Sequence, residues 1–173
     1  MSATPQMILN AISSVLLEEG GWVNNPDDRG GPTNRGVTLT QYSVYLGRPA
    51  TVAELQAMSV ETATDLYSKS YVYSPGFVLI ENEPVLIHIV DCGVNHGPVR
   101  PTIWMQAAFS LAQDGHFGPV SAAAINAAPQ KAYRALCAAR ARFYGQIVRH
   151  DPTQSQFDAG WMDRLAHFIE LAP

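Results

Sequence analysis

The sequence predicts a mainly α-helical fold that is interrupted once by a glycine-rich loop or a short β element. Apolar residues recur at helical spacing over most of the 173 residues, and Gly and Pro separate these segments. Residues 18–38 instead combine paired glycines, paired aspartates and two threonines. With 47% hydrophobic residues, a chain of this length can bury one substantial core. We therefore expect a single compact unit of one domain or two tightly packed halves.

The first predicted helix carries an acid in its last turn. Its apolar stripe consists of Ile8, Ile12, Val15 and Leu16. At 100° per residue, Glu19 falls on this stripe and Glu18 at its edge. Gly20 and Gly21 predict the helix stop, because a residue just past a helix end often adopts the left-handed conformation. The helix end and partial burial would both raise the pKa of Glu19, as a general acid requires. The structural alternative is a carboxylate satisfied by a buried arginine or by backbone donors.

The following loop supplies a second carboxylate. Asp27 and Asp28 come after Pro26, which favours a turn, and Asp28 lies nine positions after Glu19. A pair of carboxylates, one on a helix end and one on a nearby loop, is the minimum equipment for glycoside hydrolysis. Glycines in this loop allow a ligand to approach the backbone. An ordinary solvated turn has the same composition, so it remains the alternative.

The run EGGWVNNPDDRGGPTNRGVT closely resembles the signature of glycoside hydrolase family 108, which comprises lysozyme-like N-acetylmuramidases of phages and bacteria that cleave the glycan strands of peptidoglycan. Three further segments resemble family motifs in the family's order: DLYSKSYVY (Asp65 to Tyr73), VDCGVNHGPVRPTIWMQAAFSLAQDGHFGP (Val90 to Pro119) and FDAGWMDRL (Phe157 to Leu165). The resemblance implies a lysozyme-like helical domain with peptidoglycan as its partner. It also implies a catalytic half at residues 6–75 and a helical peptidoglycan-binding half at residues 76–173.

The resemblance implies that Glu19 is the catalytic acid, and Asp28 ranks above Asp27 as the second catalytic group. Trp22, three residues after Glu19, is interpreted as an apolar wall that raises the pKa of the acid, or as a platform for a sugar ring. Val72 stands where the family usually has a tryptophan, and Tyr73 can substitute for it. The predicted substrate-binding residues are Trp22, Asn34, Thr38, Tyr71, Asn95 and His96.

Three classes of function remain open on the sequence. The first is a hydrolase that cleaves the bond between N-acetylmuramic acid and N-acetylglucosamine. The second is a lytic transglycosylase, which uses a single acid/base and gives an anhydro product. The third is a non-catalytic wall-binding protein, for which loss of the acid is the expected signature. The presence of Glu19 disfavours the third class.

Charge and composition exclude other classes of partner. A net charge of −4 argues against nucleic acid, which requires a basic stripe. Cys92 and Cys137 lie in apolar contexts and are predicted to be buried free thiols. The five histidines are scattered without metal-ligand spacing, so we expect neither a metal nor a cofactor. We also expect the protein to be a monomer. Four arginines are interpreted as a solvated helix face rather than a binding patch, with attraction to an anionic cell wall as the alternative: Arg134, Arg140, Arg142 and Arg149.

The N-terminus lacks the features of a signal peptide. The first 21 residues contain no Lys or Arg, and polar residues interrupt their apolar ones. We therefore expect no membrane anchor, synthesis in the cytoplasm, and release by a phage holin or by a dedicated secretion route.

Further helices are predicted along the rest of the chain. Thr51 and Ser59 are capping candidates for helical segments within residues 51–66. The apolar run 84–92 suits a strand by composition, but the resemblance makes it a buried helix. Phe157 and Trp161 are interpreted as anchors that pack the last helix. The remaining predicted helices span residues 98–111, 120–128, 131–150 and 158–171.

Overall fold

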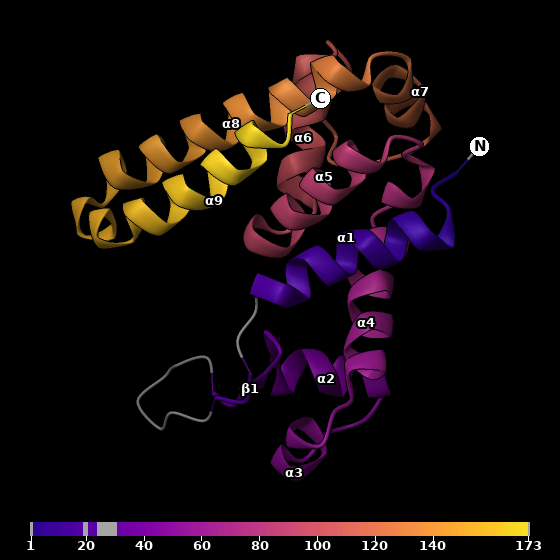
Figure 1. Ribbon diagram of the computed structural model, residues 1–173, viewed down its shortest axis with the longest axis vertical. Helices are drawn as coiled ribbons and strands as arrows, with labels where there is room; N and C mark the ends of the chain where they lie inside the picture. The colour runs from indigo at the N-terminus through magenta and orange to yellow at the C-terminus, as the bar shows by residue number, and fades with distance from the viewer. Residues whose placement is uncertain (1, 19–20, 24–30, 173) are drawn as a thin grey trace.

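The computed structural model describes residues 2–18, 21–23 and 31–172 and is mainly helical, as predicted (Figure 1). The first elements are α1 (Pro5–Glu18), β1 (Thr33–Asn34), β2 (Val37–Thr38), α2 (Leu39–Leu46), α3 (Val52–Gln56), α4 (Val60–Ser68), the π-helix η1 (Lys69–Tyr73) and the 3₁₀-helix η2 (Phe77–Leu79). The later elements are α5 (Glu83–His96), α6 (Val99–Ala108), α7 (Pro119–Ala127), α8 (Pro129–His150), η3 (Pro152–Phe157) and α9 (Asp158–Glu170). The helices predicted at residues 98–111, 120–128, 131–150 and 158–171 are confirmed as α6 to α9. The apolar run 84–92 is a helix and not a strand.

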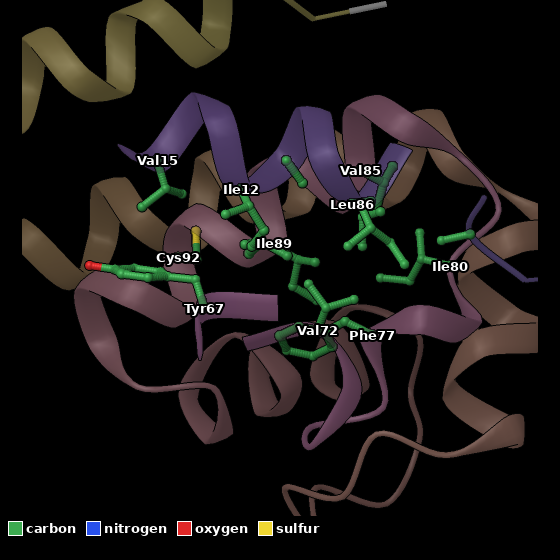
Figure 2. Packing of buried hydrophobic residues seen from close by; sticks show 14 of the residues in the cluster. Ile12, Val15, Tyr67, Val72, Phe77, Ile80, Val85, Leu86, Ile89 and Cys92 are labelled. Atoms are coloured by element: carbon green, nitrogen blue, oxygen red, sulfur yellow. The ribbon is translucent and has the colours of Figure 1, made fainter. Parts of the chain in front are cut away.

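Helix α1 lies between two groups of elements. On one side are β1, α2, α3 and α4, and on the other are α5, α6 and the antiparallel pair α8 and α9 (Figure 1). The most extensive contact of α1 is with α5, and the side chains of Asn10 and Glu83 are hydrogen-bonded at 2.6 Å. In Figure 2, α1 from Ile12 to Val15 and α5 from Val85 to Cys92 run in the same direction. Both helices therefore end on the same side of the molecule.

The core is a single cluster that draws residues from both predicted halves of the chain. Ile12 and Val15 of α1 are fully buried, and they pack with Leu86 and Ile89 of α5 (Figure 2). Burying a side chain of this size stabilises the fold by about 1.5–3 kcal/mol. The apolar stripe predicted for α1 is confirmed, because Ile8 is also buried and Leu16 packs against the cluster.

The predicted short β element is an antiparallel hairpin of β1 and β2. Asn34 pairs with Val37, and the two residues between them, Arg35 and Gly36, have φ values of 52° and 73°. A two-residue loop with positive φ at both positions matches the right-handed twist of the strands. Thr33 also forms a β-bridge with Val23, which places residues 21–23 alongside the hairpin.

Both predicted capping residues are confirmed, and one helix was not predicted. Thr51 caps α3, and Ser59 caps α4 through the N–H of Thr62. Helix α2 starts at a capping box in which the side chain of Thr38 accepts from the N–H of Gln41 and Gln41 accepts from the N–H of Thr38. The Thr-x-x-Gln spacing is the sequence signal for this helix start.

Three helices meet at one buried carboxylate. Asp91 of α5 pairs with Arg140 of α8 at 2.6 Å, and Arg164 of α9 donates to it from Nε at 2.9 Å and Nη2 at 2.5 Å. We name these three residues the Asp91 cluster. The prediction of a solvated face is wrong for Arg140, whose side chain is 0% exposed. Its Nε donates to the hydroxyl of Tyr144, which lies one helical turn away on the same buried face.

Aromatic side chains surround the Asp91 cluster. Trp161 stacks on Tyr144 with ring centroids 5.1 Å apart, which confirms its predicted role as an anchor of α9. His88 is fully buried and stacks on Phe168 at 4.2 Å. Desolvation, with the nearby Arg140, lowers the pKa of His88 to about 3, so this ring is neutral at pH 7.

The two cysteines are free thiols, as predicted. Cys92 is fully buried in the core, whereas Cys137 is only partly buried. Burial raises the pKa of the Cys92 thiol to about 12. This thiol is therefore protonated and packs as a small apolar side chain.

Changing Asp91 to Ala should destabilise the protein by about 3–5 kcal/mol, because it leaves Arg140 charged and buried without its partner. Asp91→Asn should cost less, since an amide oxygen can still accept a hydrogen bond. Lys69→Ala is the control, because it breaks the exposed pair with Asp65 and should be nearly neutral. Denaturant unfolding followed by circular dichroism measures the difference. A wild-type midpoint for Asp91→Ala would contradict this role.

Gly76 connects η1 to η2, and its change to Ala should destabilise the fold by about 2–4 kcal/mol. Its φ is 89°, and an added Cβ would lie 2.4 Å from the carbonyl oxygen of Phe117. Gly145→Ala in α8 is the matched control, because a Cβ there meets no described atom within 4 Å outside its own helix. This control should stabilise the protein by about 0.5–1 kcal/mol. Equal melting temperatures for the two variants would refute the close approach.

Candidate active site

The candidate active site is the side of the molecule on which α1 and α5 both end. Ser14 of α1 and Asp91 of α5 line one pocket, and they lie four and five residues before the ends of their helices. Each helix C-terminus carries a partial negative charge, and two adjacent ends disfavour a further anion. Glu19, the predicted catalytic acid, follows α1 directly in the sequence. Glu19, Asp27 and Asp28 lie outside the described residues.

The pocket between α1, α5 and α9 has a volume of about 320 Å³. Gly160 and Arg164 line it, and both belong to the segment FDAGWMDRL, which resembles a family motif. Asp163, which the sequence analysis did not single out, lines it too and is exposed. The position of Asp163 inside the segment FDAGWMDRL was the sequence signal that could have identified it. The full lining is Ser14, Asp91, Gly160, Asp163, Arg164, His167 and Phe168.

Asn95 and His96 occupy the last turn of α5. Asn95 is exposed, and its side-chain amide donates to the carbonyl of Asp91 at 2.8 Å. His96 is half-buried, and its ring meets Trp104, Phe143 and Tyr144 edge-on at centroid distances of 5.1–5.8 Å. Its Nε2 is buried and has no hydrogen-bond partner among the described residues. Desolvation, followed by the charge of Arg140, lowers the pKa of His96 to about 4, so the ring is neutral at pH 7.

Thr38 and Tyr71 are brought together by a residue that the sequence analysis missed. The Nε2 of Gln41 donates to the hydroxyl of Tyr71 at 3.4 Å, while its Oε1 accepts from the hydroxyl of Thr38 at 3.2 Å. The ring of Tyr71 lies 5.4 Å from that of Tyr67, whose hydroxyl donates to the carbonyl of Arg35. These contacts join the hairpin, α2 and η1 into one polar surface.

Asn34 contributes to the fold. It is 5% exposed, and its side-chain amide donates to the carbonyls of Leu55 at 2.9 Å and Gln56 at 3.1 Å. Both amide hydrogens therefore hold the hairpin against the end of α3. This geometry favours a structural role for Asn34 over a contact with a sugar.

The predicted aromatic contacts to the sugar, Trp22 and the two residues Val72 and Tyr73 of η1, lie in different parts of the structure. Trp22 is half-buried and packs against the core cluster. Val72 is fully buried, so the position where the family usually has a tryptophan belongs to the core here. Tyr73 is 53% exposed and lines a pocket with Pro5 and Ile8 at the start of α1. Tyr73 therefore lies near the start of α1 rather than near its end at Glu18, and its role as a sugar platform stays a prediction.

Gly21 is the one described residue of the predicted glycine stop. Its φ lies outside the left-handed region, and a Cβ added there would meet no described atom within 4 Å. The left-handed conformation predicted just past the helix is therefore not found at Gly21, and Gly20 lies outside the described residues. Helix α1 nevertheless reaches Glu18, so its observed extent agrees with a stop at the glycine pair.

Comparisons with known proteins match this architecture. The family model described as "Glycosyl hydrolase 108" matches residues 12–97, and the one described as "Predicted Peptidoglycan domain" matches residues 100–166. A solved structure of SagA from Brucella abortus aligns with a TM-score of 0.80 and 29% sequence identity, covering 98% of this chain and 95% of that one. A search of the curated proteins found no match. This chain belongs to the glycosyl hydrolase 108 family, and a peptidoglycan domain forms its second part.

Proposed function

We propose that this glycoside hydrolase is an N-acetylmuramidase that uses Glu19 as its general acid. Glu19 donates its proton to the glycosidic oxygen between N-acetylmuramic acid and N-acetylglucosamine. The bond from the anomeric carbon to that oxygen breaks, and the oxygen of a water molecule bonds to the anomeric carbon. The proton lost by the water passes to a second carboxylate, for which we propose Asp28.

The observation that carries the proposal is the shared end of α1 and α5. In the proposal, the acid that follows α1 in the sequence acts where both helix ends contribute partial negative charge, which would favour its protonated form. His96 in the last turn of α5 is neutral at pH 7, so it adds no positive charge that would favour the carboxylate. The Asp91 cluster holds one excess positive charge, and the carboxylate of Asp163 in the adjacent pocket opposes it.

The substrate-facing surface of the proposed enzyme combines four described residues. Trp22, which packs against the core cluster, is assigned as the apolar wall, and Tyr71, whose hydroxyl accepts from Gln41, is assigned as a polar contact to the sugar. Asn95 offers an exposed amide at the end of α5. Sugars need both apolar faces and paired donors and acceptors, and this set contains each of them.

The proposal includes a monomer that reaches the cell wall after synthesis in the cytoplasm. Peptidoglycan is the partner, and release by a phage holin would make the protein an endolysin with antimicrobial, cytolytic activity. Within the described part of the chain, the helices are too short or too polar to cross a bilayer. Detection of the protein in culture supernatant before and after expression of a holin tests the route of release.

Purified protein incubated with peptidoglycan sacculi should release muropeptides with reducing N-acetylmuramic acid ends, which mass spectrometry identifies. Glu19→Gln should retain less than about a hundredth of this activity, because positioned acid catalysis contributes about 10²-fold or more. Its thermal stability should equal or slightly exceed that of the wild type, since the amide removes an unfavourable charge.

Glu18→Gln is the matched control at the neighbouring position and should cost little activity. Anhydro products would identify a lytic transglycosylase instead. Binding to sacculi without any released product would identify a wall-binding protein. Near-normal activity of Glu19→Gln would refute the assignment of the general acid.

Asp28→Asn should lose most of the activity, and Asp27→Asn much less. A base that activates water requires carboxyl groups about 6.5–9.5 Å apart and inverts the anomeric carbon, whereas a covalent nucleophile requires about 5–5.5 Å. We expect inversion, because a glycine-bearing loop nine residues after the acid reaches the longer distance more readily. Proton NMR of a short glycan oligomer reads the anomer that forms first.

Two outcomes would redirect the assignment of the second group. A retained configuration would exclude a water-activating base in this position. A near-normal rate for Asp28→Asn would move the role elsewhere, and Asp163→Asn is then the next variant, since Asp163 lines the pocket beside α1.

A further inference from the structure

Charge is distributed unevenly along this acidic protein. Residues 92–150 contain six Lys and Arg residues but only one acid, Asp114, although the whole chain has a net charge of −4. Helices α6 and α8 lie within this region and contain no acidic residue at all. These two helices also pack against each other. Their shared surface therefore attracts anions, in contrast to the rest of the molecule.

A groove of about 500 Å³ runs between α6 and α8. Alanines form its floor, and the half-buried rings of Trp104 and Phe143 form a wall, with centroids 5.7 Å apart. This volume is within the range of about 300–1,000 Å³ that is typical of ligand sites. We name it the α6–α8 groove, and its lining residues are Trp104, Ala107, Ala108, Ala135, Ala138, Ala139, Arg142, Phe143 and Gln146.

The polar groups at the α6–α8 groove are mostly hydrogen-bond donors. Arg142 lines it, is exposed, and makes no ion pair with any described residue. Arg100 lies over the ring of Phe143 at 4.2 Å, which holds a second guanidinium at the same wall. No carboxylate lines the groove among the described residues, and Gln146 is the only side-chain amide there. Sugar hydroxyls need acceptors as well as donors, so this set suits carboxylates better than a glycan.

We propose that the α6–α8 groove binds the stem peptide of peptidoglycan through its free carboxylates. This inference rests on the proposed function, because it assigns the peptide part of the same substrate to a second site. A stem peptide carries free carboxylates and small apolar side chains, which match the guanidinium groups and the alanine floor. Residues 100–166, which contain the groove, match the peptidoglycan domain, so a wall component is the occupant that fits both observations.

His96 connects the groove with the candidate active site. Its ring contacts both aromatic residues of the groove wall, Trp104 at 5.8 Å and Phe143 at 5.1 Å. The same histidine stands at the end of α5, beside the end of α1. A strand cleaved at that end would therefore present its peptide branches near the groove, which favours strands that carry peptides.

Isothermal titration of the full chain with the tripeptide L-Ala-γ-D-Glu-diaminopimelate tests this inference. The tripeptide has no glycosidic bond, so the binding result does not depend on whether the protein is a muramidase. We expect binding that weakens as salt increases. Arg142→Glu should weaken it by roughly tenfold, the scale of one lost charge-assisted contact. Arg134→Glu is the matched control, with the same charge change at an exposed position of α8 that does not line the groove, and should leave binding unchanged.

Three further measurements separate the alternatives. A tripeptide with amidated carboxylates should bind at least about tenfold more weakly, because the guanidinium groups lose their anionic partners. The proposal is overturned if a peptide-free glycan oligomer binds instead and responds to Arg142→Glu. It is also overturned if the tripeptide fails to bind at millimolar concentration. Sedimentation that shows a dimer lost in Arg142→Glu would assign the groove to a second copy of the chain.

Discussion

The buried carboxylate of Asp91 fixes the relative positions of three helices. It is the shared acceptor for Arg140 of α8 and Arg164 of α9, so neither guanidinium can leave it without a large desolvation penalty. Helix α5, which carries Asp91, is also the main partner of α1 in the core. The direction in which α1 ends, and therefore the place where a following acid would act, depends on this ion pairing.

The interior and the candidate site use charge in opposite ways. In the interior, Arg140 of the Asp91 cluster is fully buried beside Tyr144, whereas Arg164 reaches the pocket between α1, α5 and α9. At the shared end of α1 and α5, the backbone dipoles contribute partial negative charge, and His96 is neutral at pH 7. These groups support the proposed function, which needs a place where a neutral carboxylic acid is favoured over its anion.

The helical framework could be predicted from periodicity and capping residues, because these signals are local. The buried state of Arg140 was also present in the sequence, since Leu136 and Tyr144 lie one turn away on either side, but its ionic partner Asp91 is 49 residues distant. The two carbonyls that accept from Asn34 could not be predicted, because they depend on how the hairpin meets α3. For Glu19 and Asp28 the sequence remains the only source, so both stay predictions.

The buried histidines limit the acid tolerance of the fold. His88 and His96 have pKa values lowered to about 3 and 4, whereas an unfolded chain titrates near 6.5. Below pH 6.5 the unfolded chain takes up protons that the native protein does not, so their stabilising contribution declines as the pH falls towards 4. Both rings pack between α5 and the C-terminal helices. Acidification therefore loosens the same helices that hold the end of α5 beside α1.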